Sequence, residues 1–418
     1  MPSSLTIVCV SYNSPPQNDA EAICTARLLS AIAEAGHEVH WITAAHARTL
    51  DESVENEIVN PKIRISRIPD RESGPSGRLG LELKYQAHVP YIGWIEPAVA
   101  AARQKLREHS GAVLLTRSMP VVSNIVGYYC RRIAAVWVAH FSDPYPFSFS
   151  THKGIATTAA MFFHSRWARR IISNADLITV TCANAIRFME ERLGMNFRDR
   201  VQIVTHLAVP KLIRGDTVLQ RESGEFWLAH FGALMRHRNP DELLAGLERA
   251  AQRIPTLKFL QLGHIDTGVS TQHRFGTTLR LENDKNLSPR AASDLREQVD
   301  VNVIVDADIG SDYSPFIASK YPHSVCSGRP LLMLSHPDSA MNYYTREHGG
   351  GVFASYRSSE DIEHAILKLH HEWKSGMAAG APSPALMKQF SAETIVPPLM
   401  ARLAGMLRDS SEGRKCFV

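Results

Sequence analysis

The sequence predicts an α/β protein with two doubly wound domains, each built on a parallel sheet covered by helices. Short apolar runs rich in β-branched residues alternate with longer amphipathic stretches along the 418 residues, which is the order expected of βαβ units. The alternation restarts near Phe226, after a polar segment. Domains of about 150 residues are typical, so the length agrees with two or three domains.

The first series of elements lies in residues 1–209. Residues 5–10 (LTIVCV) have the length and composition of a strand, and apolar residues at helical spacing follow over 19–36, where Gly36 ends the predicted helix. We predict further strands at 38–43, 63–68, 112–116, 135–141, 177–180 and 201–205, and a charged loop at 71–80. This series forms the predicted N-terminal domain.

The second series lies in residues 225–391 and forms the predicted C-terminal domain. A strand at 226–232 precedes a helix at 241–253, which Asn239 caps and which has Pro240 in its first turn. Residues 210–224 (PKLIRGDTVLQRESG) are polar and form the predicted linker. Further strands are predicted at 257–262, 301–305 and 330–334, and residues 392–418 contribute a final helix that we expect to pack back on the N-terminal domain.

Composition excludes several classes of protein. With 44% apolar and 21% charged residues the chain is not disordered, and a net charge of +4 is too small to indicate nucleic-acid binding. No apolar run approaches the ~18 residues of a membrane span, and the start has no secretory signal. Six cysteines without a CxxC pair indicate reduced thiols. We therefore expect a cytoplasmic protein, with contact at the inner membrane face as an option.

Known nucleotide and hydrolase motifs are also missing. The sequence has no GxxxxGK[ST] phosphate loop, no HExxH zinc helix and no GxSxG elbow. The turn after the first strand, SYNSPPQND, contains no glycine, which argues against a nicotinamide dehydrogenase. In doubly wound domains ligands bind at the carboxyl ends of the strands. Charged and polar residues that directly follow a strand are therefore the candidate binding residues, and we expect them to face a cleft.

Two segments of the second domain carry such chemistry. Gly232 ends a strand and allows close backbone approach, and Arg236 and Arg238 follow in a basic loop suited to phosphate; the alternative is that both arginines are solvated. Lys320 opens a short helix and His323 lies one turn later. A lysine at a helix start opposes the helix dipole unless an anion binds there; the alternative is an ordinary surface helix.

One segment of the first domain qualifies. The strand at 136–141 runs into His140, and Asp143 and Pro144 follow. A carboxylate and an imidazole after a strand are suited to a ligand site, although Asp-Pro is also common turn chemistry.

Taken together, these segments resemble those of retaining glycosyltransferases of the GT-B fold, in the broad family 4 group. The opening helix and strand, AEAICTARLLSAIAEAGHEVHWIT, are similar to those of that group, and TRSMP and HFSDP resemble segments of members that build bacterial surface polysaccharides. FGALMRHRNPDELL resembles the donor-phosphate loop, and SKYPHSVCSGRPLLM the segment that closes on the nucleotide sugar.

The resemblance implies a nucleoside-diphosphate sugar as donor, retention of the anomeric configuration, and no cofactor or metal. It makes residues 1–209 the acceptor-side domain and residues 225–391 the nucleotide-sugar-binding domain. It implies catalytic roles for Asp143, His140, Arg238 and Lys320. The acceptor is expected to be a saccharide or a lipid-linked group. The donor-binding residues that we assign are Gly232, Arg236, Arg238, Gly263, Ser319, Lys320 and His323.

A basic, aromatic stretch, MFFHSRWARR at 161–170, offers a way to reach a lipid-linked acceptor on an anionic membrane. The alternative is that the aromatic rings pack inward and the arginines face water.

Two rival functions remain open. One is another GT-B enzyme, such as a sugar-nucleotide epimerase, which needs no acceptor. The other is a non-catalytic partner that binds nucleotide sugars. The second is favoured by the replacement of two glutamates usual in the family by Pro315 and His323, and the glycine-rich turn usual after the first strand is replaced by Ser14-Pro15-Pro16.

Overall fold

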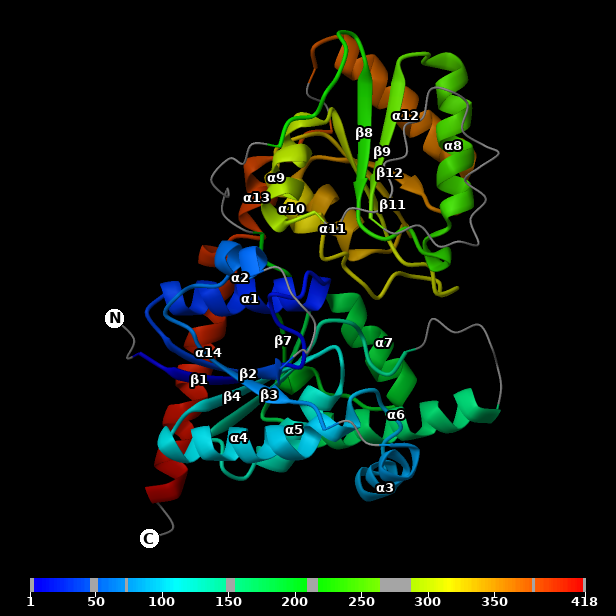
Figure 1. Ribbon diagram of the computed structural model, residues 1–418. Coiled ribbons are helices and arrows are strands. Elements are labelled where there is room, and N and C mark those ends of the chain that lie inside the picture. The colour runs from blue at the N-terminus through cyan, green and yellow to red at the C-terminus, as the bar shows by residue number, and fades with distance from the viewer. Residues whose placement is uncertain are drawn as a thin grey trace. The chain divides into compact units, whose positions relative to one another are not determined.

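The structure is a computed structural model (Figure 1), and it describes residues 4–45, 52–71, 74–147, 155–208, 217–263, 287–377 and 380–415. The chain divides into two compact units. Unit 1 contains Met1–His206 and Ala392–Val418, and unit 2 contains Leu207–Ser391.

Unit 1 is built on a seven-stranded sheet in the order β3-β2-β1-β4-β5-β6-β7. Every neighbouring pair is parallel. All six residues of β4 and of β5 are buried, as expected for central strands covered on both faces. The strands are β1 Thr6–Val10, β2 Glu38–Ala45, β3 Arg64–Pro69, β4 Val113–Ser118, β5 Val136–Phe141, β6 Leu177–Val180 and β7 Val201–Ile203.

Helices cover both faces of this sheet (Figure 1). The helices α4 and α5 pack on one face and on each other, and α6 packs beside α5, whereas α1 and α14 contact each other on the opposite face. The bounds are α1 Ala20–Glu34, α2 Glu52–Ile58, α3 Pro75–Tyr85, η1 Ile92–Trp94, α4 Ile95–Glu108, α5 Val122–Cys130, α6 Ile155–Asn174, α7 Ala183–Leu193, η2 Arg198–Arg200 and α14 Ala392–Lys415.

Unit 2 has a five-stranded parallel sheet in the order β12-β11-β10-β8-β9. Its core lies between the sheet and α8 and α12, which contact each other. The strands are β8 Phe226–Phe231, β9 Leu257–Leu262, β10 Val301–Val305, β11 Leu331–Ser335 and β12 Val352–Ser355, and the helices are η3 Arg236–Arg238, α8 Pro240–Arg253, α9 Pro289–Gln298, α10 Tyr321–Cys326, α11 Ala340–His348, α12 Ser359–Lys374 and α13 Pro384–Lys388.

Local sequence explains where many helices begin. The Asp19 carboxylate accepts a hydrogen bond from Ala22 N at 2.8 Å and starts α1, and Gly36 at φ 91° follows its end. In unit 2 a serine hydroxyl accepts from the first turn of four helices, because this satisfies an amide that the helix itself leaves open. These serines are Ser288, Ser339, Ser358 and Ser383.

Three sequence expectations need correction. Asn239 does not cap α8 with its side chain; it adopts the left-handed conformation and donates to Asp308 instead. The expected loop at 71–80 is helical from Pro75 onward, because Gly74 and Pro75 form a helix start; residues 72–73 lie outside the described part. Strand β12 was not predicted, and it lies at the edge of its sheet.

The chain enters and leaves unit 2 at neighbouring points. Ala208 N donates a hydrogen bond to Phe390 O at 3.0 Å. The last helix, α14, then belongs to unit 1, where Arg402 donates to the carbonyl oxygen of Val201 at 2.8 Å. Part of the expected linker 210–224, residues 210–216, lies outside the described residues.

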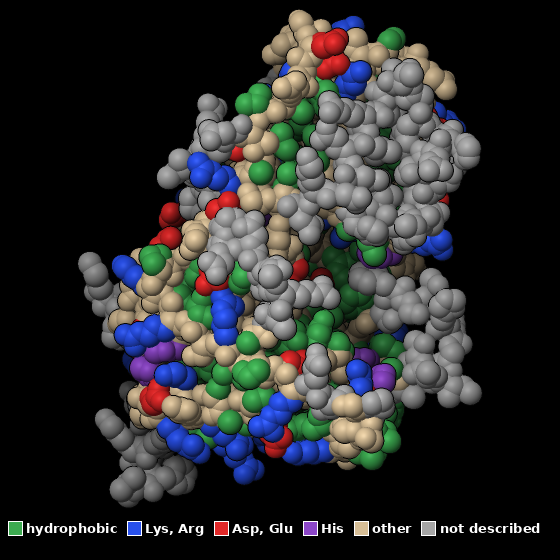
Figure 2. All heavy atoms as spheres, in the orientation of Figure 1, with side chains coloured by type: hydrophobic (Ala, Val, Ile, Leu, Met, Phe, Trp, Pro, Cys, Tyr) green, Lys and Arg blue, Asp and Glu red, His purple; other side chains and the backbone are tan. Residues whose placement is uncertain are grey.

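The described surface mixes charges of both signs. On the face drawn in Figure 2, acidic side chains lie among the Lys and Arg side chains of both units. Across the described helices, none has the length and apolar character needed to cross a bilayer.

Candidate functional site

In unit 2, the carboxyl end of β8 places Gly232 directly against Lys320. Gly232 has φ 131°, and a Cβ atom added there would lie 1.7 Å from Lys320 Nζ. The lysine side chain therefore fills the space that any other residue would need at 232. The sequence predicted Gly232 as a point of close backbone approach; the side chain found there is Lys320.

The Lys320 ammonium lies in a positively charged environment. Burial, and then the charges of Arg238 and Arg296, lower the pKa of Lys320 to about 7. Its ammonium makes no hydrogen bond or ion pair with another residue of the described part of unit 2. Burial, followed by the charge of Lys320, also lowers the pKa of His230 to about 3, so this imidazole is neutral. A half-buried cation without a counterion is a binding determinant for an anion.

The arginines reach this place from two other elements. Arg238 belongs to the 3-10 turn η3 and donates to the carbonyl oxygen of Val305, the last residue of β10. Arg296 lies on α9, and its guanidinium is 4.5 Å from the ring centroid of Phe231. Phe231 is the last residue of β8. Three cationic side chains therefore gather around the carboxyl ends of β8 and β10.

Two acidic residues follow β10, and each is held by other groups. Asp306 is buried, and its carboxylate accepts from the hydroxyls of Ser314 at 2.6 Å and Ser335 at 2.7 Å; burial raises its pKa. Asp308 pairs with Arg357, and its hydrogen bonds, the one from Arg357 first, outweigh burial and lower its pKa.

The remaining predicted donor residues lie on the same elements. Gly263 follows β9 at φ 128°, and a Cβ there would lie 2.6 Å from the carbonyl carbon of Gly232, so the two glycines approach closely. Arg236 is exposed on η3, Ser319 is half-buried beside Lys320, and His323 is half-buried within α10. No contact of Arg236, Ser319 or His323 with the Lys320 ammonium is present, and their donor roles stay predictions.

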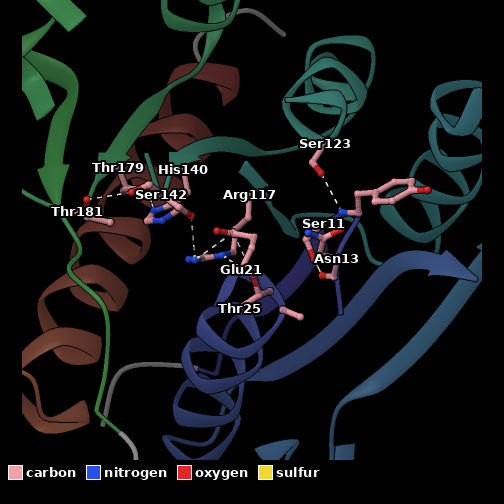
Figure 3. Close-up of polar contacts among 12 residues, drawn as sticks. Ser11, Asn13, Glu21, Thr25, Arg117, Ser123, His140, Ser142, Thr179 and Thr181 are labelled. Carbon is pink, nitrogen blue, oxygen red and sulfur yellow. Dashed lines mark hydrogen bonds and ion pairs between the residues drawn. The ribbon is translucent and has the colours of Figure 1, made fainter. Parts of the chain in front are cut away.

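In unit 1, a buried ion pair lies at the carboxyl end of β4 (Figure 3). Arg117 Nη2 lies 3.4 Å from Glu21 Oε1, and their side chains are only 2% and 11% exposed. Arg117 also donates to the hydroxyls of Thr25 at 2.9 Å and Ser142 at 3.4 Å. Burial raises the pKa of Glu21 to about 8, even though Arg117 opposes this shift.

His140 lies at the end of β5, with its ring completely enclosed. Its Nδ1 is 3.0 Å from the Thr179 hydroxyl on β6 (Figure 3), and its Nε2 is buried without a hydrogen-bond partner in the part of the chain that the structure describes. Burial, and then Arg117, lower its pKa well below the usual value. The ring is thus a neutral imidazole with one nitrogen available to a water or a ligand.

Asp143 and His206 extend the group in unit 1. Asp143 is half-buried, two residues after β5 ends. His206 is buried, and burial followed by Arg117 lowers its pKa to about 4, although the charges of Glu21 and Asp143 act in the opposite direction. Unit 1 therefore holds acids, bases and hydroxyls together at the carboxyl ends of its central strands.

Sequence reasoning missed Glu21, Arg117, His206 and Arg296. Arg117 lies within TRSMP, which the family resemblance marked without assigning it a role. Glu21 has the appearance of an ordinary acidic residue in a first helical turn, and only the fold brings it beside β4. Its position after the first strand was the one available signal.

The stretch 161–170 forms part of α6, in which Trp167 and Ala168 are buried whereas Arg166 and Arg169 are exposed. Trp167 is fully buried and donates to the carbonyl oxygen of Tyr85 at 3.1 Å. Arg169 donates to Leu193 O, and Arg170 to Gln86 Oε1. Phe163 is half-buried, and Phe162 has 64% of its surface exposed. The inward-packing alternative therefore describes Trp167 but not Phe162, and contact of this stretch with a membrane stays a prediction.

No known protein family and no curated protein matches the sequence. Solved structures do match. HepE of Anabaena, in complex with UDP and glucose, is 13% identical, with 96% of this chain and 100% of that chain covered and a TM-score of 0.64. A glycosyltransferase from Rickettsia africae ESF-5 is 10% identical, with coverages of 97% and 99% and a TM-score of 0.64.

A putative UDP-N-acetylglucosamine 2-epimerase from Listeria monocytogenes is also similar, at 10% identity, with coverages of 96% and 97% and a TM-score of 0.57. The chain therefore has the GT-B architecture of two parallel-sheet α/β domains, which confirms the predicted fold. At these identities the likeness establishes the fold, and the reaction has to be argued from the two sites.

Proposed function

We propose that this protein is a glycosyltransferase that moves a sugar from a nucleoside-diphosphate sugar to a hydroxyl group, without a metal ion. The observation that carries the proposal is the Lys320 ammonium, which lies beside Gly232 under the influence of Arg238 and Arg296 and has no counterion in the described part of unit 2. A diphosphate supplies the missing negative charge.

In the proposed reaction, unit 2 binds the diphosphate and stabilises it as it leaves. The bond between the anomeric carbon and the β-phosphate oxygen breaks, and negative charge develops on that oxygen. Lys320 and Arg238 stabilise this charge, the role that a metal ion has in other transferases. Because Lys320 has a pKa of about 7, the approach of the diphosphate raises that pKa and restores the full charge.

Unit 1 is the proposed acceptor side. The acceptor hydroxyl bonds to the anomeric carbon on the face that the phosphate leaves, and its proton passes to the departing phosphate oxygen. Attack on this face gives retention of configuration. His140 and Asp143 position the acceptor or the transferred sugar, half-buried Asp143 by direct contact and enclosed His140 by holding the end of β5 against Thr179 of β6. A saccharide or a lipid-linked acceptor fits this role, and exposed Phe162 is the one aromatic contact we propose with a membrane.

Uridine diphosphate is the first nucleotide to test, since HepE was solved with UDP and with UDP-glucose. Wild-type protein is screened against UDP-, GDP- and other nucleotide sugars by thermal shift, and then for release of the free nucleoside diphosphate with a panel of saccharide acceptors. A ligand at 100 times its dissociation constant adds about 2.7 kcal/mol to stability.

Lys320→Ala is the matched variant in this screen. We expect it to lose both the thermal shift and turnover. A variant that binds and turns over donors like the wild type contradicts the donor site.

The second candidate is a sugar-nucleotide epimerase, which the Listeria structure favours. It differs in needing no acceptor, so epimerised nucleotide sugar formed without any acceptor identifies it. Binding of donors with no turnover in any combination favours the non-catalytic partner. Membership of family 4, a role in surface polysaccharide synthesis and a cytoplasmic location stay predictions.

A further inference from the structure

Two histidines and a glutamate converge in unit 1, away from the sites described above. Glu38 and His40 lie two residues apart on β2, and therefore on the same face of the strand. His109 ends α4, which packs against β2. Glu38 is the first residue of its strand, so the group lies at the amino ends of the strands, whereas the candidate acceptor residues lie at their carboxyl ends.

The candidate ligand atoms are close enough to share one ion. His40 Nε2 is 3.1 Å from Glu38 Oε1, and His109 Nδ1 is 3.9 Å from Glu38 Oε2. One ligand atom from each residue lies within 4.8 Å of the others. Two ligands of a tetrahedral zinc ion at about 2.1 Å stand roughly 3.3 Å apart, so small side-chain rotations bring the three atoms to that geometry.

We propose that Glu38, His40 and His109 bind one zinc ion, with water as the fourth ligand. Imidazole nitrogens suit zinc and related transition metals, whereas magnesium and calcium prefer oxygen ligands alone. The carboxyl end of α4 carries partial negative charge, which favours a cation beside His109. The Thr6 hydroxyl donates to Glu38 Oε2 at 3.2 Å and orients the carboxylate.

One competitor is present. Arg64 Nη1 lies 3.1 Å from Glu38 Oε1, but its side chain is 70% exposed. Exposed ion pairs contribute little to stability, and a long arginine side chain swings into water easily. Zinc therefore displaces Arg64 from Glu38.

The bound ion joins β2 to the end of α4, and so connects two elements of unit 1 that the sequence separates widely. Its place at the amino ends of the strands makes it independent of the transfer reaction. The site does not rest on the proposed function, and its test needs no activity measurement.

Untagged full-length protein, freed of metal by a chelator, is titrated with zinc against a chromophoric competitor. We expect one equivalent of tight binding in the wild type, at least tenfold weaker binding in His109→Asn, and equal or tighter binding in Arg64→Gln. With cobalt(II) in place of zinc, we expect the strong visible absorption of a tetrahedral site, lost in His109→Asn.

His88→Asn is the matched control. His88 also faces a glutamate in unit 1, with its Nδ1 3.1 Å from Glu82 Oε1, but has no second histidine in that pair, so the tight equivalent should remain. Circular dichroism confirms that each variant is folded. The proposal is overturned if wild type and His109→Asn bind zinc alike, or if His88→Asn loses the tight equivalent.

Discussion

Lys320 lies at the carboxyl end of β8 in unit 2, and Glu21 lies at the carboxyl end of β4 in unit 1. Removal from water shifts the pKa of each side chain in the direction that favours its neutral form. Lys320 loses its proton more easily, with a pKa of about 7, and Glu21 keeps its proton, with a pKa of about 8. The difference lies in their neighbours. Glu21 has Arg117 as a counterion, whereas Lys320 has only cations as its main charged influences. Above pH 8 Glu21 ionises and Arg117 balances its charge within unit 1, whereas no residue of the described part of unit 2 pairs with the Lys320 ammonium.

The largest expected effect is the loss of stability when the Arg117 side chain is removed from unit 1. Above pH 8, where Glu21 is ionised, Arg117→Met leaves a buried carboxylate without its counterion and removes the hydrogen bonds to Thr25 and Ser142. Breaking a buried pair in this way costs about 3–5 kcal/mol, which denaturant unfolding measures. The double variant with Glu21→Leu should recover much of this loss. A single variant as stable as the wild type would show that the pair contributes nothing.

The second prediction concerns charge stabilisation in unit 2. Arg238→Ala should lower transfer by roughly 10²–10³-fold, the usual effect of removing one donor to a developing negative charge, with unfolding little changed. Arg253→Ala is the control, because Arg253 lies at the other end of α8 and pairs with Glu363 at 3.7 Å. Equal activity of both variants would remove Arg238 from the mechanism.

The third prediction uses the titration of Lys320. Below its pKa of about 7 the unliganded lysine is charged and ready for a diphosphate. Above pH 7 the proton has to be taken up on binding, so nucleotide affinity should fall by up to about tenfold per pH unit. Lys320→Arg keeps its charge, so isothermal titration at several pH values should give a flatter profile. A wild-type affinity that is constant from pH 6 to about 9 contradicts the lowered pKa.

The fourth prediction concerns the pH dependence of stability from Glu21, which acts gradually over several pH units. Its folded pKa of about 8 lies above the unfolded value of 4.5, so between these values the folded state binds the extra proton. Stability therefore declines as pH rises through this window, by at most about 1.4 kcal/mol per pH unit, and less where neighbours share the proton. Glu21→Gln should reduce this decline in unfolding experiments. A steeper decline in the variant would be inconsistent with a raised pKa.

The sequence predicted the fold well because hydrophobic periodicity is a local property. The predicted strands 177–180, 257–262 and 301–305 coincide with β6, β9 and β10. Strand β12 was not predicted because it is short, lies at the edge of its sheet and is only partly buried. Without a continuous apolar run, an edge strand of this kind resembles a loop.

The candidate sites were predicted less completely because their geometry depends on contacts between distant segments. Gly232 and Lys320 were each singled out, yet only the fold places the lysine side chain where a Cβ would be. Glu21 and Arg117 form a pair that no local sequence pattern indicates. Residue type after a strand is a useful guide to a site, but it does not identify the partner.

The hydrogen bond from Ala208 to Phe390 means that the two ends of unit 2 lie close together in space. It is thus an insertion into unit 1, whose own sequence resumes with α14. Because the ends of unit 2 are adjacent, a homologous domain can replace it without interrupting the seven-stranded sheet of unit 1. Under the proposed function, such an exchange would change the donor while the acceptor half keeps its entire framework.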